Sequence, residues 1–215
     1  MKSIGITLRV SEVSSYQERR DCIDQRWFKL LLSSGVMPVL IPNNIDLFNV
    51  MLDEYKLNGF ILTGGNDLQM YGGSVPERDA LEYSILTYCI DNEIPVLGVC
   101  RGMQVIQNYF GVSLNLIPNH VATYHSIVYE SDTTNSQILR NITSVNSFHK
   151  FGSYLSNPPL NIVAKSLDGV VMAIEHDSLP IFGHMWHPER DAVFHKSQIL
   201  FLQQFFGSDL DDQRY

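Results

Sequence analysis

The chain of 215 residues contains only three cysteines, and they are widely separated: Cys22, Cys89 and Cys100. No two of them form a Cys-x-x-Cys pair, so the sequence predicts neither a disulfide framework nor a zinc ribbon. His184 and His187 lie three residues apart, but no further Cys, Asp or Glu arrangement completes a recognisable metal site around them. We therefore expect no metal and no cofactor.

Positive charge and long apolar runs are also scarce. Lys and Arg total 15 against 23 Asp and Glu, a formal net charge of −8, whereas proteins that bind a nucleic-acid polymer cluster basic residues. No apolar run approaches the roughly 20 residues of a membrane-spanning helix, and residues 1–5 lead into a predicted strand instead of a signal peptide. We expect a cytoplasmic protein that uses neither nucleic acid nor a membrane as partner. A local positive pocket for a small anion stays compatible with this charge.

What the chain does contain is enough apolar residues, 45% of the total, for one substantial core. We therefore predict a single domain over residues 1–215. Short apolar runs predict buried strands at 4–8, 36–41, 60–62 and 96–99, with helical periodicity between them. This alternation predicts an α/β fold in which a largely parallel central sheet is flanked by helices.

The second half of the chain has a different pattern. Apolar runs at 162–165, 170–174 and 181–186 follow one another closely and predict hairpins. A last helix is expected at about 193–206. The polar residues 207–215 are expected to fray.

One cysteine lies where a strand is predicted to meet a helix. Cys100 follows the apolar run 96–99, has Gly98 and Gly102 two residues away on either side, and precedes a helical pattern. A strained strand-to-helix turn needs small neighbours, and a helix N-terminus favours a thiolate. The alternative interpretation is a small buried cysteine without chemical function.

Two distant segments supply what a cysteine nucleophile needs. His187 and Glu189, two residues apart across a proline, suit a base and the group that orients it. Gly64 and Gly65 follow a predicted strand and can present backbone N–H groups to an oxyanion. Ligands bind beyond the carboxyl ends of parallel strands, so we expect the two glycines and Cys100 at that edge of the sheet.

In their order along the chain, the glycine loop, the cysteine turn and the His-x-Glu pair resemble the class I glutamine amidotransferase family, which implies a flavodoxin-like fold. Further motifs narrow the resemblance to the free-standing γ-glutamyl hydrolase branch, which includes the γ-glutamyl-γ-aminobutyrate hydrolases. The motifs are Ile4-Gly5-Ile6-Thr7, Gly64-Gly65-Asn66-Asp67, Arg78-Asp79-Ala80-Leu81-Glu82, Cys100-Arg101-Gly102-Met103-Gln104, Asn146-Ser147-Phe148-His149 and His187-Pro188-Glu189. The resemblance covers nearly the whole chain, but Lys150 stands where related enzymes often carry a second histidine.

The resemblance implies a mechanism and a set of site residues. Cys100 would attack the γ-carbonyl of a glutamyl amide, His187 would transfer protons and Glu189 would orient His187, so that a glutamyl thioester forms and is then hydrolysed. Backbone N–H groups of Gly65 and Arg101 would form the oxyanion hole. The motif around Arg78 would brace the loop beside the site. The residues expected to contact the substrate are Gln104, Ser147, Phe148, His149 and His120.

Three functions stay open at this point. The chain is a free-standing hydrolase of small γ-glutamyl amides, a glutaminase subunit that passes ammonia to a separate synthetase, or a non-catalytic binding module on the same fold. The intact Cys, His and Glu set argues against the binding module, and the turn containing Arg101 favours the free-standing hydrolase. Only the glutaminase function would require a protein partner, and a homodimer is left open.

The leaving group of the substrate is the least determined feature. Residues 119–125 resemble a segment of hydrolases encoded with surface-polysaccharide (capsule) pathways, some of which release glutamate from a glutamylated nucleotide amidate. If this resemblance holds, His120, His125, His149 and Lys150 are candidates for binding a phosphate of the leaving group. The histidines of the segment are otherwise hairpin residues on a polar face.

Overall fold

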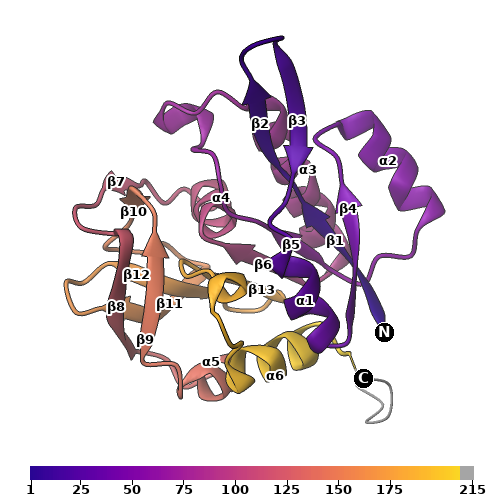
Figure 1. Ribbon diagram of the computed structural model, residues 1–215. Coiled ribbons are helices and arrows are strands. Elements are labelled where there is room, and N and C mark those ends of the chain that lie inside the picture. Colours follow the sequence, from indigo (N-terminus) through magenta and orange to yellow (C-terminus); the bar gives the residue numbers. More distant parts are fainter. Residues whose placement is uncertain (209–215) are drawn as a thin grey trace.

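A nine-stranded mixed sheet runs through the structure, a computed structural model that describes residues 1–208 (Figure 1). In spatial order the strands are β4 (Val36–Ile41), β1 (Lys2–Thr7), β5 (Phe60–Leu62), β6 (Val96–Val99), β13 (Ile181–His184), β12 (Val171–His176), β11 (Leu160–Ser166), β8 (Val121–Tyr129) and β9 (Ser144–Phe148). The first five are parallel to their neighbours, and each later pair is antiparallel. The parallel block and the hairpins of the second half are both as predicted.

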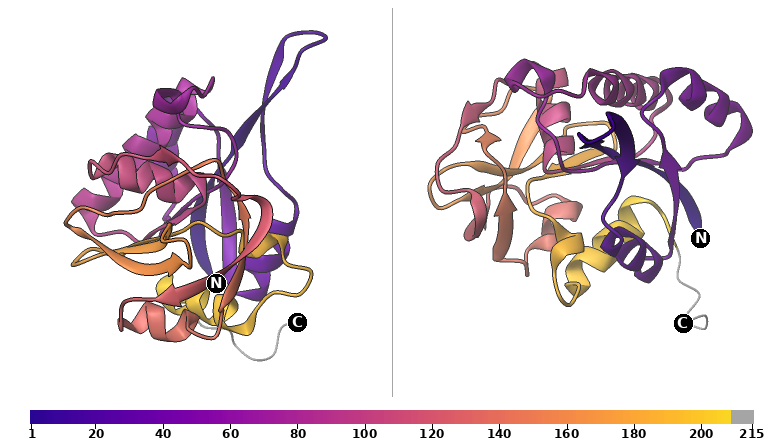
Figure 2. Two further views of the ribbon diagram at one scale, coloured as in Figure 1. Left: turned by 90° about the vertical axis from the view of Figure 1, so that its left-hand side faces the viewer. Right: turned by 45° about the horizontal axis from the view of Figure 1, so that its top comes forward.

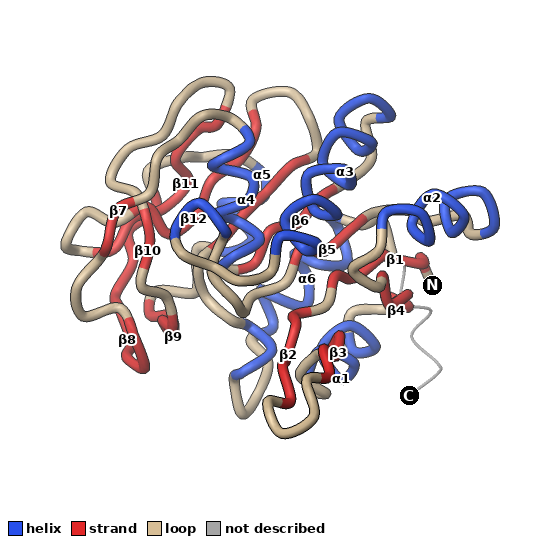
Figure 3. The backbone as a smooth tube through the Cα atoms, turned by 90° about the horizontal axis from the view of Figure 1, so that it is seen from above, coloured by secondary structure: helices blue, strands red, loops and turns tan. Residues whose placement is uncertain are grey.

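Helices cover both faces of the sheet. They are α1 (Arg26–Ser33), α2 (Ile45–Glu54), α3 (Pro76–Asn92), α4 (Arg101–Tyr109), α5 (Thr134–Leu139) and α6 (Lys196–Phe205). Figures 2 and 3 show α2, α3 and α4 on one face and α1, α5 and α6 on the other. Because strands covered on both faces have no solvent side, every residue of β5, β6 and β13 is buried. These three strands form the centre of the sheet and carry the loops described below.

A hairpin of β2 (Arg9–Val13) and β3 (Glu18–Cys22) projects from the body of the molecule (Figure 2). The sequence pattern predicts no strands here, because the residues are mostly polar and exposed and so lack the apolar alternation that marks a half-buried strand. The remaining short elements are β7 (Asn115–Leu116), which pairs with β10 (Phe151–Gly152), and the 3₁₀ turns η1 (Gln69–Tyr71) and η2 (Pro188–Arg190).

Some predicted boundaries shift. Strand β1 spans Lys2–Thr7 instead of 4–8, and α6 begins at Lys196 instead of about 193. The later start of α6 has a local cause, because the His195 side chain accepts a hydrogen bond from the Ser197 N–H and caps the helix there. Of the predicted fraying tail, Ser208 is buried and its hydroxyl donates to the Ser34 carbonyl at 2.9 Å. Residues 209–215 lie outside the described part of the chain.

Among the helices of residues 1–208, none combines the length and the apolar character that a membrane span requires.

Candidate active site

The ends of three neighbouring parallel strands bring together segments that are far apart in sequence. Register pairs Leu62 with Gly98 and His184 with Val99, so β5, β6 and β13 end at the same edge of the sheet. The loops that follow carry Gly64, Cys100 and His187. A Cβ built on Gly64 would lie 2.5 Å from Cε1 of His187 and 3.4 Å from Cβ of Cys100, so both side chains lie against this glycine. A side chain at Gly64 would collide with the imidazole.

Cys100 occupies a strained turn between β6 and α4. Its φ of 54° and ψ of −106° lie outside the regions that L-residues ordinarily adopt, and its N–H donates to the His184 carbonyl at 2.8 Å. A Cβ on Gly98 would lie 2.6 Å from the backbone of Gly102, and one on Gly102 would lie 2.0 Å from the Leu62 carbonyl oxygen. Both glycines are therefore needed for the close approach of strand, turn and helix. The arrangement is that of a nucleophile elbow.

His187 is fixed from two directions. Its Nδ1 lies 2.7 Å from Oε1 of Glu189, which leaves Nε2 for the side of Gly64 and Cys100. Its backbone exchanges two hydrogen bonds with the Asn146 side chain, from N–H to Oδ1 at 2.9 Å and from Nδ2 to the carbonyl at 2.8 Å. The local sequence around Asn146 does not indicate this role, because the partner lies 41 residues away.

The electrostatics of His187 favour the imidazolium. Burial by itself lowers the pKa of a histidine, but the Cys100 sulfur and the Glu189 carboxylate outweigh that effect and raise the pKa of His187 to about 9. Cys100, His187 and Glu189 are 5%, 2% and 2% exposed. Because water screens such buried charges little, the His187 imidazolium would stabilise negative charge that develops on the Cys100 sulfur.

A buried ion network braces the glycine loop, as the motif around Arg78 was expected to do. Arg78 donates from Nη2 to the Thr63 carbonyl at 2.6 Å and from Nη1 to the carbonyl of Gly65. Glu82 is fully buried; its carboxylate accepts a hydrogen bond from Nε of Arg78 at 3.0 Å and also forms an ion pair with Arg101. Arg101 is the first residue of α4, so the network connects the loop after β5 to the helix after the elbow.

We expect Glu82→Gln to lower the free energy of unfolding by about 3 kcal/mol or more, because the buried Arg78 loses its carboxylate partner and the buried Arg101 keeps only Asp79. Urea denaturation followed by circular dichroism measures the loss. Glu77→Gln on the same helix is the control, since the Glu77 ion pair with Arg19 is exposed to water and is expected to contribute much less than the buried network. Equal effects of the two substitutions would contradict the prediction.

Three of the predicted substrate contacts lie on α4 and β9. Gln104 follows the elbow by one helical turn, and its Nε2 donates to the Phe151 carbonyl at 2.9 Å. Ser147 is buried, with its hydroxyl donating to the His120 carbonyl at 2.8 Å. Phe148 is 39% exposed, and its ring meets that of His187 edge to face at 5.9 Å. Phe148 therefore borders the candidate nucleophile site directly.

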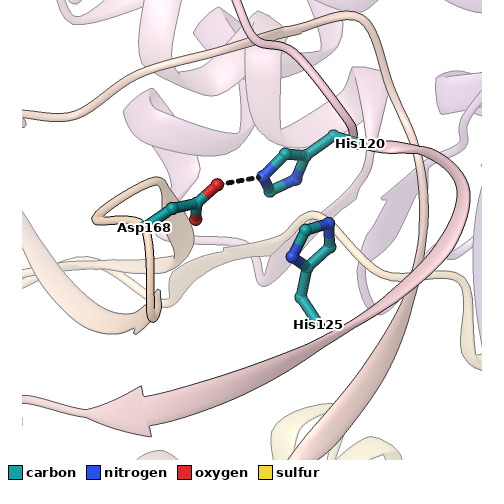
Figure 4. Close-up of side chains that lie close together, drawn as sticks. All are labelled: His120, His125 and Asp168. Atoms are coloured by element: carbon teal, nitrogen blue, oxygen red, sulfur yellow. Dashed lines mark hydrogen bonds and ion pairs between the residues drawn. The ribbon is translucent and has the colours of Figure 1, made fainter.

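The two predicted histidine contacts are placed differently. His120 is fully buried, with Nε2 3.0 Å from Asp168 (Figure 4). Its Nδ1 lies 3.2 Å from Nε2 of His149. His149 places its Nδ1 2.9 Å from the Phe151 carbonyl. All four ring nitrogens thus have partners within the protein. This pairing favours a structural role behind Ser147, whereas contact of either histidine with substrate stays a prediction.

His120, His125 and Asp168 also form the one group of potential metal ligands found within residues 1–208. The rings of His120 and His125 stack at 3.8 Å with planes only 11° apart. A ring nitrogen binds a metal in the plane of its ring, so two stacked parallel rings do not direct their nitrogens at a common ion. His125 Nε2 moreover lies 3.1 Å from the Asn119 carbonyl. The arrangement fits a hydrogen-bonded stack better than a metal centre.

Two buried neutral histidines make the stability depend on pH. Burial, as the largest effect, lowers the pKa of His149 to about 4 and that of His184 to about 3. Below the unfolded-state pKa of about 6.5 the unfolded chain binds protons that the folded chain does not, so stability falls as pH falls. Between the unfolded-state pKa and its own folded-state pKa, each histidine lowers the free energy of unfolding by about 1.4 kcal/mol for every unit by which the pH falls.

We therefore expect these two histidines to lower the free energy of unfolding by about 3 to 4 kcal/mol between pH 7 and pH 5. Urea titrations at closely spaced pH values measure the profile. His149→Gln is expected to remove about half of the slope, because glutamine does not titrate. A profile that stays equally steep in that variant would count against the assignment.

Known proteins are similar to this chain over most of its length. The model of the family described as Peptidase C26 matches residues 3–189. The gamma-glutamyl-CDP-amidate hydrolase of Campylobacter jejuni is 32% identical over 202 residues, covering 92% of this chain and 94% of that protein. The gamma-glutamyl-gamma-aminobutyrate hydrolase of Escherichia coli K12 is 26% identical over 213 residues, covering 83% of each.

A solved structure shares the fold. It is that of a Thermoplasma acidophilum protein described as part of a GMP synthase, with a TM-score of 0.70 at 20% identity over 96% of this chain and 93% of the other. Together with the family match, this likeness confirms the expected fold and the resemblance stated from the motifs. The chain belongs to the Peptidase C26 family and is thus a class I glutamine amidotransferase-like hydrolase that acts on C–N amide bonds.

Proposed function

We propose that this chain, as a single domain over residues 1–215, hydrolyses the γ-glutamyl amide bond of a small glutamylated amine or nucleotide amidate and releases glutamate. The observation that carries the proposal is the placement of His187 between Cys100 and Glu189 at the ends of adjacent parallel strands. The names of the two relatives reported above support γ-glutamyl compounds as substrates.

In the first half of the reaction, the Cys100 sulfur attacks the γ-carbonyl carbon. The carbonyl oxygen becomes an oxyanion, for which the N–H groups of Gly65 and Arg101 are the proposed donors. Arg101 suits this role because the first residue of a helix has no partner for its N–H within the helix. The C–N bond then breaks as the His187 imidazolium gives its proton to the departing nitrogen, and a glutamyl thioester remains on Cys100.

In the second half, water hydrolyses the thioester. His187, now neutral, takes a proton from the water as its oxygen attacks the carbonyl carbon, and the C–S bond breaks to release glutamate. The thiolate and the imidazolium are restored. Glu189 accepts the hydrogen bond from Nδ1–H throughout, which keeps Nε2 directed at the reacting atoms.

The glutamyl end is proposed to bind on the side of α4 and β9. The Nε2 of Gln104 donates a hydrogen bond to the Phe151 carbonyl, so the Oε1 of Gln104 is the group free to accept a hydrogen bond from the substrate ammonium. Ser147 and Phe148 would contribute backbone groups, because the Ser147 hydroxyl is already used on His120. His149 and His120 would keep this wall in place from behind.

We propose that the enzyme needs no protein partner and acts in the cytoplasm. The segment 119–125 favours a role in surface-polysaccharide (capsule) synthesis.

The test is glutamate release by the purified chain alone from γ-glutamyl ethanolamide and from glutamine. We expect the amide with the larger leaving group to react faster, because remote binding energy contributes to rate only when the remote group is present. Activity toward glutamine that appears only with a synthetase present would establish the glutaminase function instead.

A further inference from the structure

Two arginines line the recess that adjoins His187 and Gly64. Arg9 begins β2 and Arg190 ends η2, and both face the recess together with Asp24, Trp27 and Glu189. The Arg9 side chain lies against Gly65, whose built Cβ would be 3.0 Å from Cδ of Arg9. The guanidinium carbon of Arg190 lies 4.3 Å from the centre of the Phe148 ring. Both cations are therefore next to the proposed oxyanion loop and base.

The position of Arg9 is held by the same network that braces the glycine loop. Asn66, the residue after Gly65, accepts from the Val10 N–H at 2.9 Å and donates to the Val10 carbonyl at 3.0 Å. The Oδ1 of Asn66 also accepts a hydrogen bond from Nη1 of Arg78 at 3.2 Å. The root of the β2–β3 hairpin is thus fixed to the loop, whereas the Arg9 side chain is exposed and has no hydrogen bond or ion pair with any residue in 1–208.

The carboxylates around the recess are already engaged. Asp24 pairs with Arg26 at 2.7 Å, and this hydrogen bond is the main reason that the pKa of Asp24 is lowered to about 2. Glu189 binds His187 at 2.7 Å, and Arg190 lies 3.6 Å from the same oxygen. The recess therefore presents the free charge of Arg9, with Arg190 beside it, in a chain whose net charge is −8.

The recess lies on the leaving-group side of the site. His187, which would protonate the departing nitrogen, is one of its lining residues, and so is Gly64 of the oxyanion loop. Gln104 and Ser147, the proposed glutamyl contacts, are not among its lining residues. With the glutamyl end on the side of Gln104 and Ser147, a group attached to the amide nitrogen would extend toward this recess.

We propose that Arg9, assisted by Arg190, binds a phosphate or diphosphate of the leaving group, so that the preferred substrates are γ-glutamyl amides of phosphorylated amines. Arginine suits this task because its planar guanidinium forms paired hydrogen bonds with phosphate oxygens. The inference rests on the proposed function. It replaces the sequence-based assignment of phosphate binding to His120 and His149, whose ring nitrogens are already occupied.

The test compares two substrates that differ only in a phosphate: the γ-glutamyl amides of O-phosphoethanolamine and of ethanolamine. For Arg9→Met in the full chain we expect kcat/KM to fall at least about tenfold for the phosphorylated amide and to change less than about twofold for the neutral one. Arg9→Lys keeps the positive charge but not the planar guanidinium, so it is expected to retain part of the preference for the phosphorylated amide. Lys56→Met, at an exposed residue that follows the C-cap of α2, is the matched control for loss of one positive charge and is expected to alter neither substrate. Lys150→Met tests the alternative phosphate site named from the sequence.

The outcomes separate the two proposals. If wild type hydrolyses the neutral amide but Arg9→Met affects both substrates equally or neither, the phosphate site is wrong and the proposed function stands. Preferential loss in Lys150→Met would assign the phosphate to the segment around His149. If wild type hydrolyses neither amide, the proposed function fails, and calorimetric titration with inorganic diphosphate still tests the site. There we expect Arg9→Met to weaken binding at least about tenfold, and unchanged affinity would overturn the inference.

Discussion

Replacement of Cys100 by alanine is expected to lower kcat for glutamate release by a factor on the order of 10⁴ or more, because the Cys100 side chain lies with His187 against Gly64 and supplies the sulfur of the proposed covalent intermediate. Cys22→Ala and Cys89→Ala are the matched controls. Cys89 is 1% exposed and its pKa is raised by burial, so it has no thiolate to offer. We expect both control variants to stay within a few-fold of wild type, as judged by initial rates of glutamate formation.

The same variant separates chemistry from folding. Cys100 is the residue with φ of 54° in the elbow, and alanine has a similar volume. The thermal unfolding midpoint is therefore expected to change by only a few degrees. Mass spectrometry of acid-quenched wild type is expected to reveal a glutamyl adduct on the peptide that contains Cys100. Substantial turnover by Cys100→Ala would overturn the proposed mechanism.

Loss of the base has the next largest expected effect. His187→Ala is expected to be nearly as damaging as Cys100→Ala, because one residue both stabilises the thiolate and protonates the leaving nitrogen. Glu189→Gln removes the charge but keeps an acceptor for Nδ1, so we expect a loss at least about tenfold smaller than that of His187→Ala. Single-turnover rates of amine release measure both variants on the same step.

A histidine outside the site provides the control for His187. His195 caps α6, and asparagine is also a good N-cap, so His195→Asn is expected to keep both stability and turnover. Unchanged turnover in His187→Ala would exclude its role as base. A Glu189→Gln variant as damaged as His187→Ala would mean that the charge of Glu189, and not only its orientation of the ring, is needed for the reaction.

Sequence and structure agree most fully at β6 and Cys100. The apolar run 96–99 predicted a buried strand with the bounds that β6 has. Gly98 and Gly102 predicted a strained turn that needs small neighbours, and in the structure a Cβ on Gly98 would collide with Gly102 and one on Gly102 with Leu62. Such features are local, because strand burial and positive φ depend on a few consecutive residues.

The sequence by itself thus determined the parallel strands, the elbow at Cys100 and the family, since apolar periodicity and short glycine motifs are properties of contiguous residues. The tertiary structure decided which polar groups become partners. Asn146 is joined to His187 across 41 residues, Val10 to Asn66 across 56, and His120 to Asp168 across 48. The physical reason is that a buried polar group must find a partner wherever packing places one, so its role depends on neighbours that are distant along the chain.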